Sequence, residues 1–135
     1  VRKVSKSWKI EKGQVWSQWS PFPGIEVTTT ITPTANGHRR RHQIHSQWAC
    51  EAYDCGFAIP NFAPGYTEMV DDTAAEAQCT GMRCRVQGAG GQGVVIGCDP
   101  NTSLYHPNVH LPAVRYAIPA GDILLETEVL DHADS

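Results

Sequence analysis

The sequence is poor in charge and has no long apolar run. Charged residues make up 19% of its 135 positions, and no stretch approaches the roughly 20 consecutive apolar residues of a membrane-spanning helix. The formal net charge is -3, and no nucleic-acid-binding motif occurs. We therefore predict neither a membrane nor a nucleic acid as partner. The first residue is Val1 and no apolar signal segment follows it, so we expect a processed or excised part of a longer polypeptide.

The cysteines do not form a complete disulfide framework or a zinc motif. There are five of them, at Cys50, Cys55, Cys79, Cys84 and Cys98. Two pairs have the spacing Cys-x4-Cys rather than the Cys-x2-Cys of structural zinc sites. An odd number excludes full pairing but leaves one or two bridges open, and the cellular compartment is left open as well. His42 and His45 lie three apart, which places them on opposite faces of a strand. We therefore predict no metal site and no cofactor.

Glycine, proline and β-branched residues are plentiful instead, and they favour an all-β chain. Gly 12 and Pro 9 together make up about one residue in six. Apolar and polar residues alternate over 7–12, 14–20 and 25–32, and they predict three strands. The Asn36-Gly37 pair predicts a hairpin turn into a fourth strand over 38–48. Beyond it we expect a loop over 50–70, a short helical turn over 71–78, strands over 82–87 and 94–98, an ordered loop over 99–112, and strands over 114–118 and 123–130.

Charge is distributed unevenly between the two ends. The first dozen residues are basic, with Arg2, Lys3, Lys6, Lys9 and Lys12. The last dozen or so are acidic, with Asp122, Glu126, Glu128, Asp131 and Asp134. We expect two solvated strands of opposite sign that pair across a sheet. A groove for an anionic ligand, built partly from the basic end, is the alternative.

Several of these stretches, in this order, resemble one known family. They are Trp8-Lys-Ile-Glu11, Val15-Trp-Ser-Gln-Trp19-Ser-Pro21, Ile25-Glu-Val-Thr-Thr29, His38-Arg-Arg-Arg-His42-Gln-Ile-His45, Pro100-Asn-Thr-Ser-Leu104, Leu111-Pro112 and Pro119-Ala-Gly-Asp-Ile-Leu-Leu125. Together they resemble the C-terminal β-sandwich of domain of unknown function 2264, which is similar to the heparinase II/III-like polysaccharide lyases. The resemblance covers nearly the whole chain.

The resemblance implies an antiparallel β-sandwich with an incomplete or open edge, forming one domain over residues 1–135. It also implies an N-terminal α/α toroid, which the 135 residues do not include, and which contributes much of the cleft in such lyases. The expected function is therefore a non-catalytic, carbohydrate-associated domain that supports a lyase-like toroid. A free-standing glycan-binding or self-assembling module is the alternative, and a lyase acting by β-elimination on uronic-acid sugars is the third. The expected partners are an acidic oligosaccharide or polysaccharide, and the toroid or another chain at the open edge.

The chemistry-bearing residues gather in the strand over 38–48, which is polar on both faces. Such a strand lies at an edge, under a partner or along a groove. In a lyase, His42 would move protons and Arg40 would hold a uronate carboxylate, which makes them the catalytic candidates. The structural alternative is a solvated strand whose arginines pair with the acidic C-terminal strand. The predicted ligand-binding residues are Trp16, Arg39, Arg41, His45, Trp48 and Tyr105; the aromatic ones would be platforms for sugar rings.

Overall fold

The computed structural model describes residues 4–102 and 108–131, and the side chains of residues 7–100 and 108–131. It contains twelve strands: β1 (Val4–Glu11), β2 (Gln14–Phe22), β3 (Ile25–Thr34), β4 (Gly37–Ser46), β5 (Cys50–Cys55), β6 (Ile59–Pro60), β7 (Thr67–Val70), β8 (Ala74–Cys79), β9 (Met82–Gly91), β10 (Val94–Thr102), β11 (Val109–Ile118) and β12 (Gly121–Leu130). The described residues form no helix, so none that is long and apolar enough to cross a membrane.

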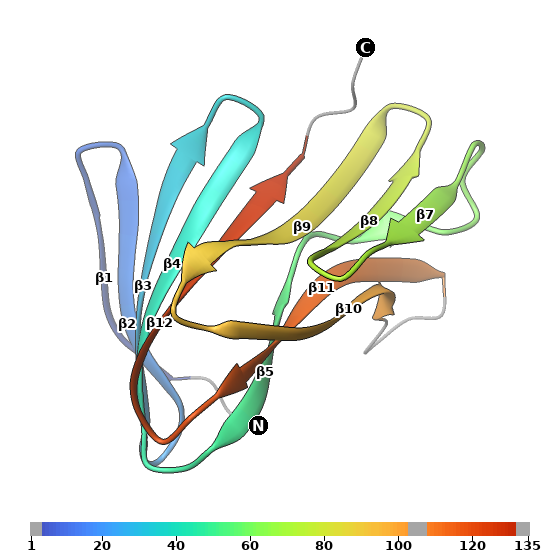
Figure 1. The fold of residues 1–135 in the computed structure, drawn as a ribbon. Helices are drawn as coiled ribbons and strands as arrows, with labels where there is room; N and C mark the ends of the chain where they lie inside the picture. The colour runs from blue at the N-terminus through green and yellow to red at the C-terminus, as the bar shows by residue number, and fades with distance from the viewer. Residues whose placement is uncertain (1–3, 103–107, 132–135) are drawn as a thin grey trace.

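Two antiparallel sheets pack face to face (Figure 1). The large sheet has the order β1-β2-β3-β4-β12-β9-β8-β7. The small sheet has the order β10-β11-β5, and β6 pairs with the start of β11. The expected fold class, an antiparallel β-sandwich with open edges, is confirmed.

The hairpin between β3 and β4 forms where the sequence predicts it. Its glycine, Gly37, is required for close packing of two strands rather than for the backbone conformation of the turn. The turn lies at Ala35 and Asn36, and Thr34 pairs with Gly37. Gly37 is not among the glycines with positive φ. A Cβ atom at Gly37 would collide with the backbone carbonyl of Val129, so this glycine allows β4 and β12 to approach closely.

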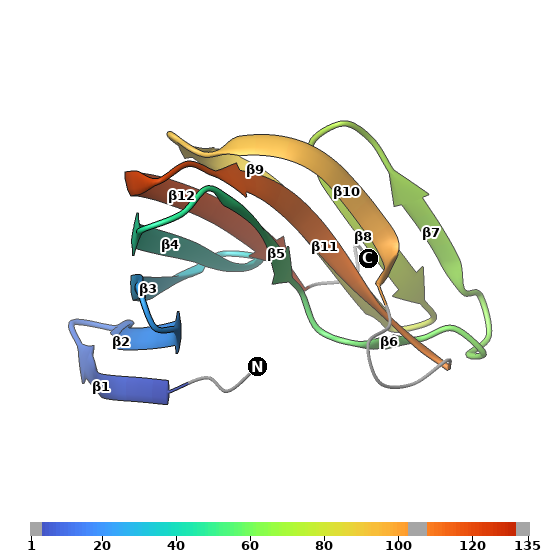
Figure 2. The ribbon, with the colours of Figure 1, turned by 90° about the horizontal axis from the view of Figure 1, so that it is seen from below.

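The core lies between the small sheet and the strands of the large sheet that face it. On the large sheet it includes Val27, Ile44 and Leu125, which are almost fully buried, and the small sheet contributes Val114 and Tyr116. The small sheet lies over β12, β9 and β8, whereas β1 and β2 project beyond it (Figure 2). The inner face of the large sheet is therefore partly uncovered at β1 and β2.

Three expectations about the elements are wrong. Residues 71–78 do not form a helical turn: the Asp71 carboxylate accepts the N–H groups of Thr73 and Ala74, and β8 begins at Ala74. Pairing with β7 and β9 and burial override the helical preference of alanine there. The segment 50–70 is not a loop but contains β5, β6 and β7, and β10 and β11 extend into the expected loop over 99–112.

The charged ends do not pair with each other. β1 is the edge strand beside β2, and β12 lies between β4 and β9, so that expectation is wrong as well. β4 is an interior strand of the large sheet rather than an edge strand. Its arginines do face the acidic strand, as the structural alternative predicted: Arg39 lies 3.3 Å from Glu128, and Arg41 lies 3.8 Å from Glu126.

Candidate functional site

Strand β4 divides the predicted site residues between the two faces of the large sheet. Alternation along the strand directs Arg40 and His42 inward, toward the small sheet, and Arg39, Arg41 and His45 outward. The inward residues are half-buried and the outward ones are exposed. The structure therefore separates the catalytic candidates from most of the ligand-binding candidates.

His42 is held at both ring nitrogens. Its Nε2 lies 2.9 Å from an Asp54 carboxylate oxygen on β5, and its Nδ1 lies 2.8 Å from the Thr29 hydroxyl on β3. The Trp19 indole N–H donates to the same hydroxyl at 3.0 Å. The Thr29 hydroxyl can therefore donate to Nδ1 while Nε2–H donates to Asp54, a tautomer that satisfies every member of the chain.

Arg40 supports the same carboxylate from the next inward position of β4. It donates to Asp54 at 2.7 Å, to the Cys55 carbonyl at 2.7 Å and to the His38 ring at 3.0 Å. Burial lowers the pKa of His38, and the charge of Arg40 adds to this effect. Two residues of the opposite sheet, Arg40 and His42, therefore hydrogen-bond to the Asp54 carboxylate.

The Asp54 carboxylate stays ionised although it is buried. Its side chain is only 13% exposed, and burial alone would raise its pKa. The hydrogen bond from His42 and the charge of Arg40 outweigh that effect and lower the pKa to about 2. This network joins the two sheets. His42 could accept a proton from a substrate only if one of its two hydrogen bonds opened.

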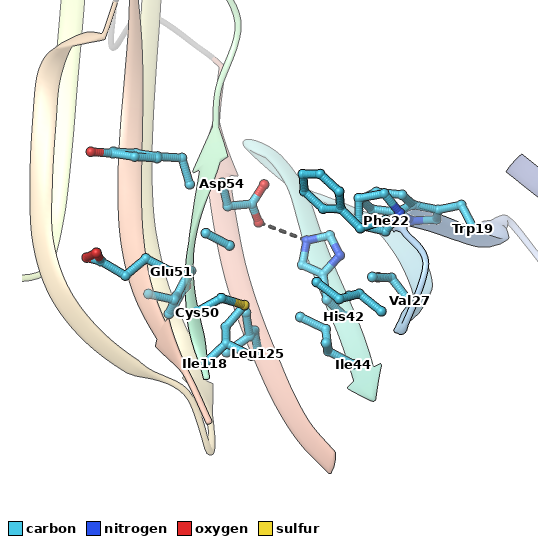
Figure 3. Close-up of a pocket in the computed structure, with 15 residues that line it drawn as sticks. Trp19, Phe22, Val27, His42, Ile44, Cys50, Glu51, Asp54, Ile118 and Leu125 are labelled. Carbon is cyan, nitrogen blue, oxygen red and sulfur yellow. Dashed lines mark hydrogen bonds and ion pairs between the residues drawn. The ribbon is translucent and has the colours of Figure 1, made fainter. Parts of the chain in front are cut away.

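An apolar cleft of about 300 Å³ opens beside this network, between β5 and the inner face of the large sheet (Figure 3). Figure 3 shows the His42–Asp54 hydrogen bond in one of its walls. Most of the lining is apolar. It consists of Trp19, Pro21, Phe22, Ile25, Val27, His42, Ile44, Cys50, Glu51, Ala52, Tyr53, Asp54, Tyr116, Ile118 and Leu125.

The outward residues form a polar shelf on the opposite face. Strand register places Trp16, Thr30, Arg41 and Glu126 in one row across four strands. A shallow hollow of about 510 Å³ lies over this row and the next, lined by Gln14, Thr30, Thr32, Thr34, Arg39, Arg41 and Glu126. Its two arginines each face a glutamate, so the shelf carries alternating charge rather than a surplus of positive charge.

The remaining ligand-binding candidates lie apart from this hollow. His45 pairs with Asp122 at 2.8 Å farther along the outer face. Trp48 follows β4, is 52% exposed and lies against Gly24. Tyr105 lies outside the residues that the structure describes. Of the predicted set, the structure thus brings Arg39 and Arg41 together in the hollow, and Trp16 lies on the same face, two strands from Arg41, without lining it.

Sequence reasoning missed Asp54 and Thr29 as partners of His42. The signal for Asp54 was the inward alternation of Cys50, Ala52 and Asp54, which was hidden inside the expected loop. Thr29 carries no such signal, because nothing in the sequence indicates which threonine meets a histidine.

A second polar cluster, also unpredicted, lies at the far end of the sandwich. The Tyr66 hydroxyl donates to Glu68 at 2.7 Å and lies 2.6 Å from His110 Nδ1, and Asn61 lies 3.1 Å from the other ring nitrogen. Burial and the Glu68 carboxylate raise the pKa of Tyr66. This closed set of hydrogen bonds ties β11 to β7 and to the loop before it. In the described parts of the chain, no group of three or more His, Cys, Asp or Glu residues is placed to hold a metal ion, and all five cysteines are free thiols.

Comparison with known proteins identifies the fold. No family model and no curated protein matches the sequence. The chain is similar to a solved structure of a mutant of the heparan sulfate lyase HepC from Pedobacter heparinus, with a TM-score of 0.57 and 8% identity over 99% of this chain and 22% of that one. It is also similar to the heparinase III-BT4657 gene product, with a TM-score of 0.51 and 10% identity over 96% of this chain and 21% of that one. A methylated-lysine form of that product matches with a TM-score of 0.56. The chain therefore spans about a fifth of the length of the structures it matches and shares the fold of that part.

Proposed function

We propose that this chain is a non-catalytic, carbohydrate-associated domain that supports a polysaccharide lyase-like catalytic domain. The fold supports this proposal, because two solved heparinases contain a domain of this shape within a much longer chain. Membership of domain of unknown function 2264, the toroid as the supported domain, and the extent of the domain over 1–135 belong to the same proposal.

The hydrogen bonding of His42 is the observation that supports a non-catalytic role for this domain. Both of its ring nitrogens are hydrogen-bonded inside the protein, and Arg40 is committed to Asp54 and to a backbone carbonyl. A general base must lie within hydrogen-bond reach of the proton that it removes from the substrate, and the ring nitrogen of His42 that could accept a proton is already hydrogen-bonded to the Thr29 hydroxyl. The pair therefore suits a structural role between the sheets better than proton transfer.

The outer shelf is the proposed contact with an acidic oligosaccharide. Arg41 is 61% exposed on its side chain and Arg39 is 48% exposed, so both can donate to a carboxylate or sulfate. Trp16 lies in the same row as Arg41 and offers a partly exposed ring. Because each arginine already faces a glutamate, we expect weak binding that weakens further with salt.

A titration of the isolated chain with a heparan sulfate hexasaccharide tests this proposal. We expect weak binding, loss of most of it in Arg41→Ala, and no ultraviolet absorbance from unsaturated uronate. Arg115→Ala is the matched control, because Arg115 lies on the small sheet and is 40% exposed. Appearance of that absorbance, and its loss in His42→Ala, would establish the lyase alternative instead. Strong binding lost in Trp16→Ala but kept in Arg41→Ala would favour a free-standing glycan-binding module.

A self-assembling module is the remaining candidate, and the edge strand β1 favours it. Among the described residues β1 pairs with β2 alone, and its Trp8 and Ile10 are 68% and 69% exposed. Sedimentation of the isolated chain over a range of concentrations tests this candidate, with Ile10→Lys as the variant that should prevent association.

A further inference from the structure

One row of side chains crosses four strands on the outer face of the large sheet. Strand register aligns one residue from each strand, namely Lys9, Trp16, Thr30 and Arg41. The four strands lie side by side, in the order β1-β2-β3-β4 (Figure 1). The Lys9 ammonium lies 5.3 Å from the centre of the Trp16 ring, so the two residues are in contact. The basic end of the sequence therefore contributes a cation to the polar shelf, and we call these four residues the cross-strand row.

Three polar groups of the cross-strand row are free to bond a ligand. Within the described residues, the Trp16 indole N–H, the Thr30 hydroxyl and the Arg41 guanidinium make no hydrogen bond. Arg41 has a loose ion pair with Glu126, because its Nε lies 3.8 Å from the carboxylate, which is longer than a hydrogen bond. None of the three groups is among the polar atoms that are buried without a partner, so each of them reaches solvent.

The neighbours of Arg41 along its own strand already have hydrogen-bond partners. Arg39 donates to Glu128 at 3.3 Å. The Gln43 amide donates to the Ile123 carbonyl, also at 3.3 Å. A ligand that ran along β4 would have to displace these bonds, whereas a ligand that crosses the strands meets the free groups. The hydrogen bonding of the outer face therefore favours binding across the strands.

We propose that the acidic oligosaccharide lies along the cross-strand row, so that its chain crosses the strands and Lys9 binds a second anionic group. The inference rests on the proposed function, and it adds a direction and a second cation to that binding site. Neighbouring strands lie about 4.8 Å apart, which places Lys9 about 10 to 15 Å from Arg41. Each pyranose ring lengthens an extended sugar chain by a step similar to this spacing, so a chain of about four rings reaches both cations.

The chemistry of an acidic sugar chain matches the row from end to end. Its carboxylates or sulfates accept hydrogen bonds from a guanidinium or an ammonium, which Arg41 and Lys9 supply. A hydroxyl group of an intervening ring can bond the Thr30 hydroxyl, and the apolar C–H side of a ring can pack on the Trp16 indole. A ligand with a single anionic group would leave one of the two cations unused.

The ion pairs of the two cations leave room for this contact. Lys9 lies 2.9 Å from Glu11, and the two side chains are 56% and 57% exposed. Ion pairs this exposed add little stability and open readily. An ammonium has three N–H groups and a guanidinium has five, so Lys9 and Arg41 can each donate to a ligand while the paired glutamate stays in place. Once one cation has bound the chain, the second contact is intramolecular and therefore adds affinity.

Titration of the wild-type chain with a disaccharide and a tetrasaccharide of heparan sulfate tests the inference. We expect the tetrasaccharide to bind about tenfold more tightly than the disaccharide, because only the longer fragment reaches both cations. Lys9→Gln should remove most of this gain. Lys12→Gln is the matched control, because it removes the same charge from an exposed lysine in the turn after β1, outside the row. It should weaken binding less than about twofold, since a charge outside the contact is screened by salt.

Proton NMR of the wild type gives a second measurement that needs no variant. The indole N–H resonance of Trp16 should shift when the tetrasaccharide binds, because this group lies in the middle of the row. Trp48 is 52% exposed and lies outside the row, so its indole N–H resonance should stay in place. Equal thermal unfolding of the wild type and the two lysine variants shows that they differ in binding and not in folding.

The inference is overturned, and the proposed function stands, if Arg41→Ala weakens tetrasaccharide binding but Lys9→Gln has no more effect than Lys12→Gln. Equal affinity of the two fragments, or a shift of the Trp48 resonance without one at Trp16, would overturn it as well. If no fragment binds at millimolar concentration, the proposed contact with an acidic oligosaccharide fails and the inference fails with it. The two failures are therefore distinguishable.

Discussion

Acid should destabilise this protein through one buried carboxylate. Asp54 has a pKa of about 2 in the folded chain, against an ordinary value of 3.8. At about 1.4 kcal/mol for each pH unit, this difference amounts to about 2 kcal/mol. The pKa is lowered on folding, so the contribution is fully present above about pH 4. It is lost as the pH falls from there toward 2, because the folded state must then protonate a carboxylate that His42 and Arg40 hold ionised.

The measurement is urea unfolding of the wild type and of Asp54→Asn at pH values from 2 to 7. Urea is preferred to guanidinium chloride because a salt would screen the charges. The wild type should lose about 2 kcal/mol more than the variant between pH 5 and pH 2. At pH 7 the variant should be less stable by about 3 kcal/mol, because it leaves a buried cation without its partner.

Equal pH dependence in the two proteins would refute this reasoning. If Asp54→Asn does not fold, a carbon NMR titration of the wild-type Asp54 carboxyl group answers the same question. A midpoint near 4 would show that His42 and Arg40 do not hold the carboxylate ionised.

Three further comparisons test the packing of the two sheets by denaturant unfolding. Gly37→Ala should lower the free energy of unfolding by about 2 kcal/mol or more, because a Cβ atom would push β4 away from β12. Gly81→Ala should lower it by about 1 kcal/mol, because Gly81 has a positive φ of 83° but nothing lies near its Cβ position. Arg40→Ala should lower the free energy of unfolding by about 3 kcal/mol and Arg41→Ala by less than about 1 kcal/mol, because only Arg40→Ala leaves a buried carboxylate without its cation. Equal losses would contradict the division of β4 into an inner and an outer face. Tyr116→Phe should cost about 1 kcal/mol, because it removes a buried hydroxyl with two hydrogen-bond partners, and an unchanged midpoint would show that these bonds contribute nothing.

Strand alternation gives the two faces of β4 different surroundings. Every second residue of β4 belongs to the buried connection between the sheets, and the residues between them belong to an exposed surface. A change on the outer face can therefore alter the exposed surface while the buried connection between the sheets is kept. This separation supports the proposal of a scaffold that presents a glycan-facing surface.

The sequence by itself determined the class of fold and the faces of the first strands. The alternation over 25–32 and 38–48 correctly predicts which residues of β3 and β4 share a face, since side chains along a strand alternate with a period of two. The same periodicity separates His42 from His45 without any knowledge of neighbouring strands. In the second half, buried alanines and short strands carry a weak local signal, so β5, β7 and β8 were not predicted.

Only the tertiary structure decided which residues meet. Asp54 reaches His42 and Arg40 because the two sheets pack face to face, and a contact between sheets leaves no periodic mark in the sequence. The order of strands likewise depends on the tertiary structure. It places β4 in the interior of the large sheet and pairs the acidic strand β12 with β4 rather than with the basic strand β1. Order within a sheet depends on long-range pairing and on the burial of whole faces, whereas the alternation of a strand depends on its own backbone geometry alone.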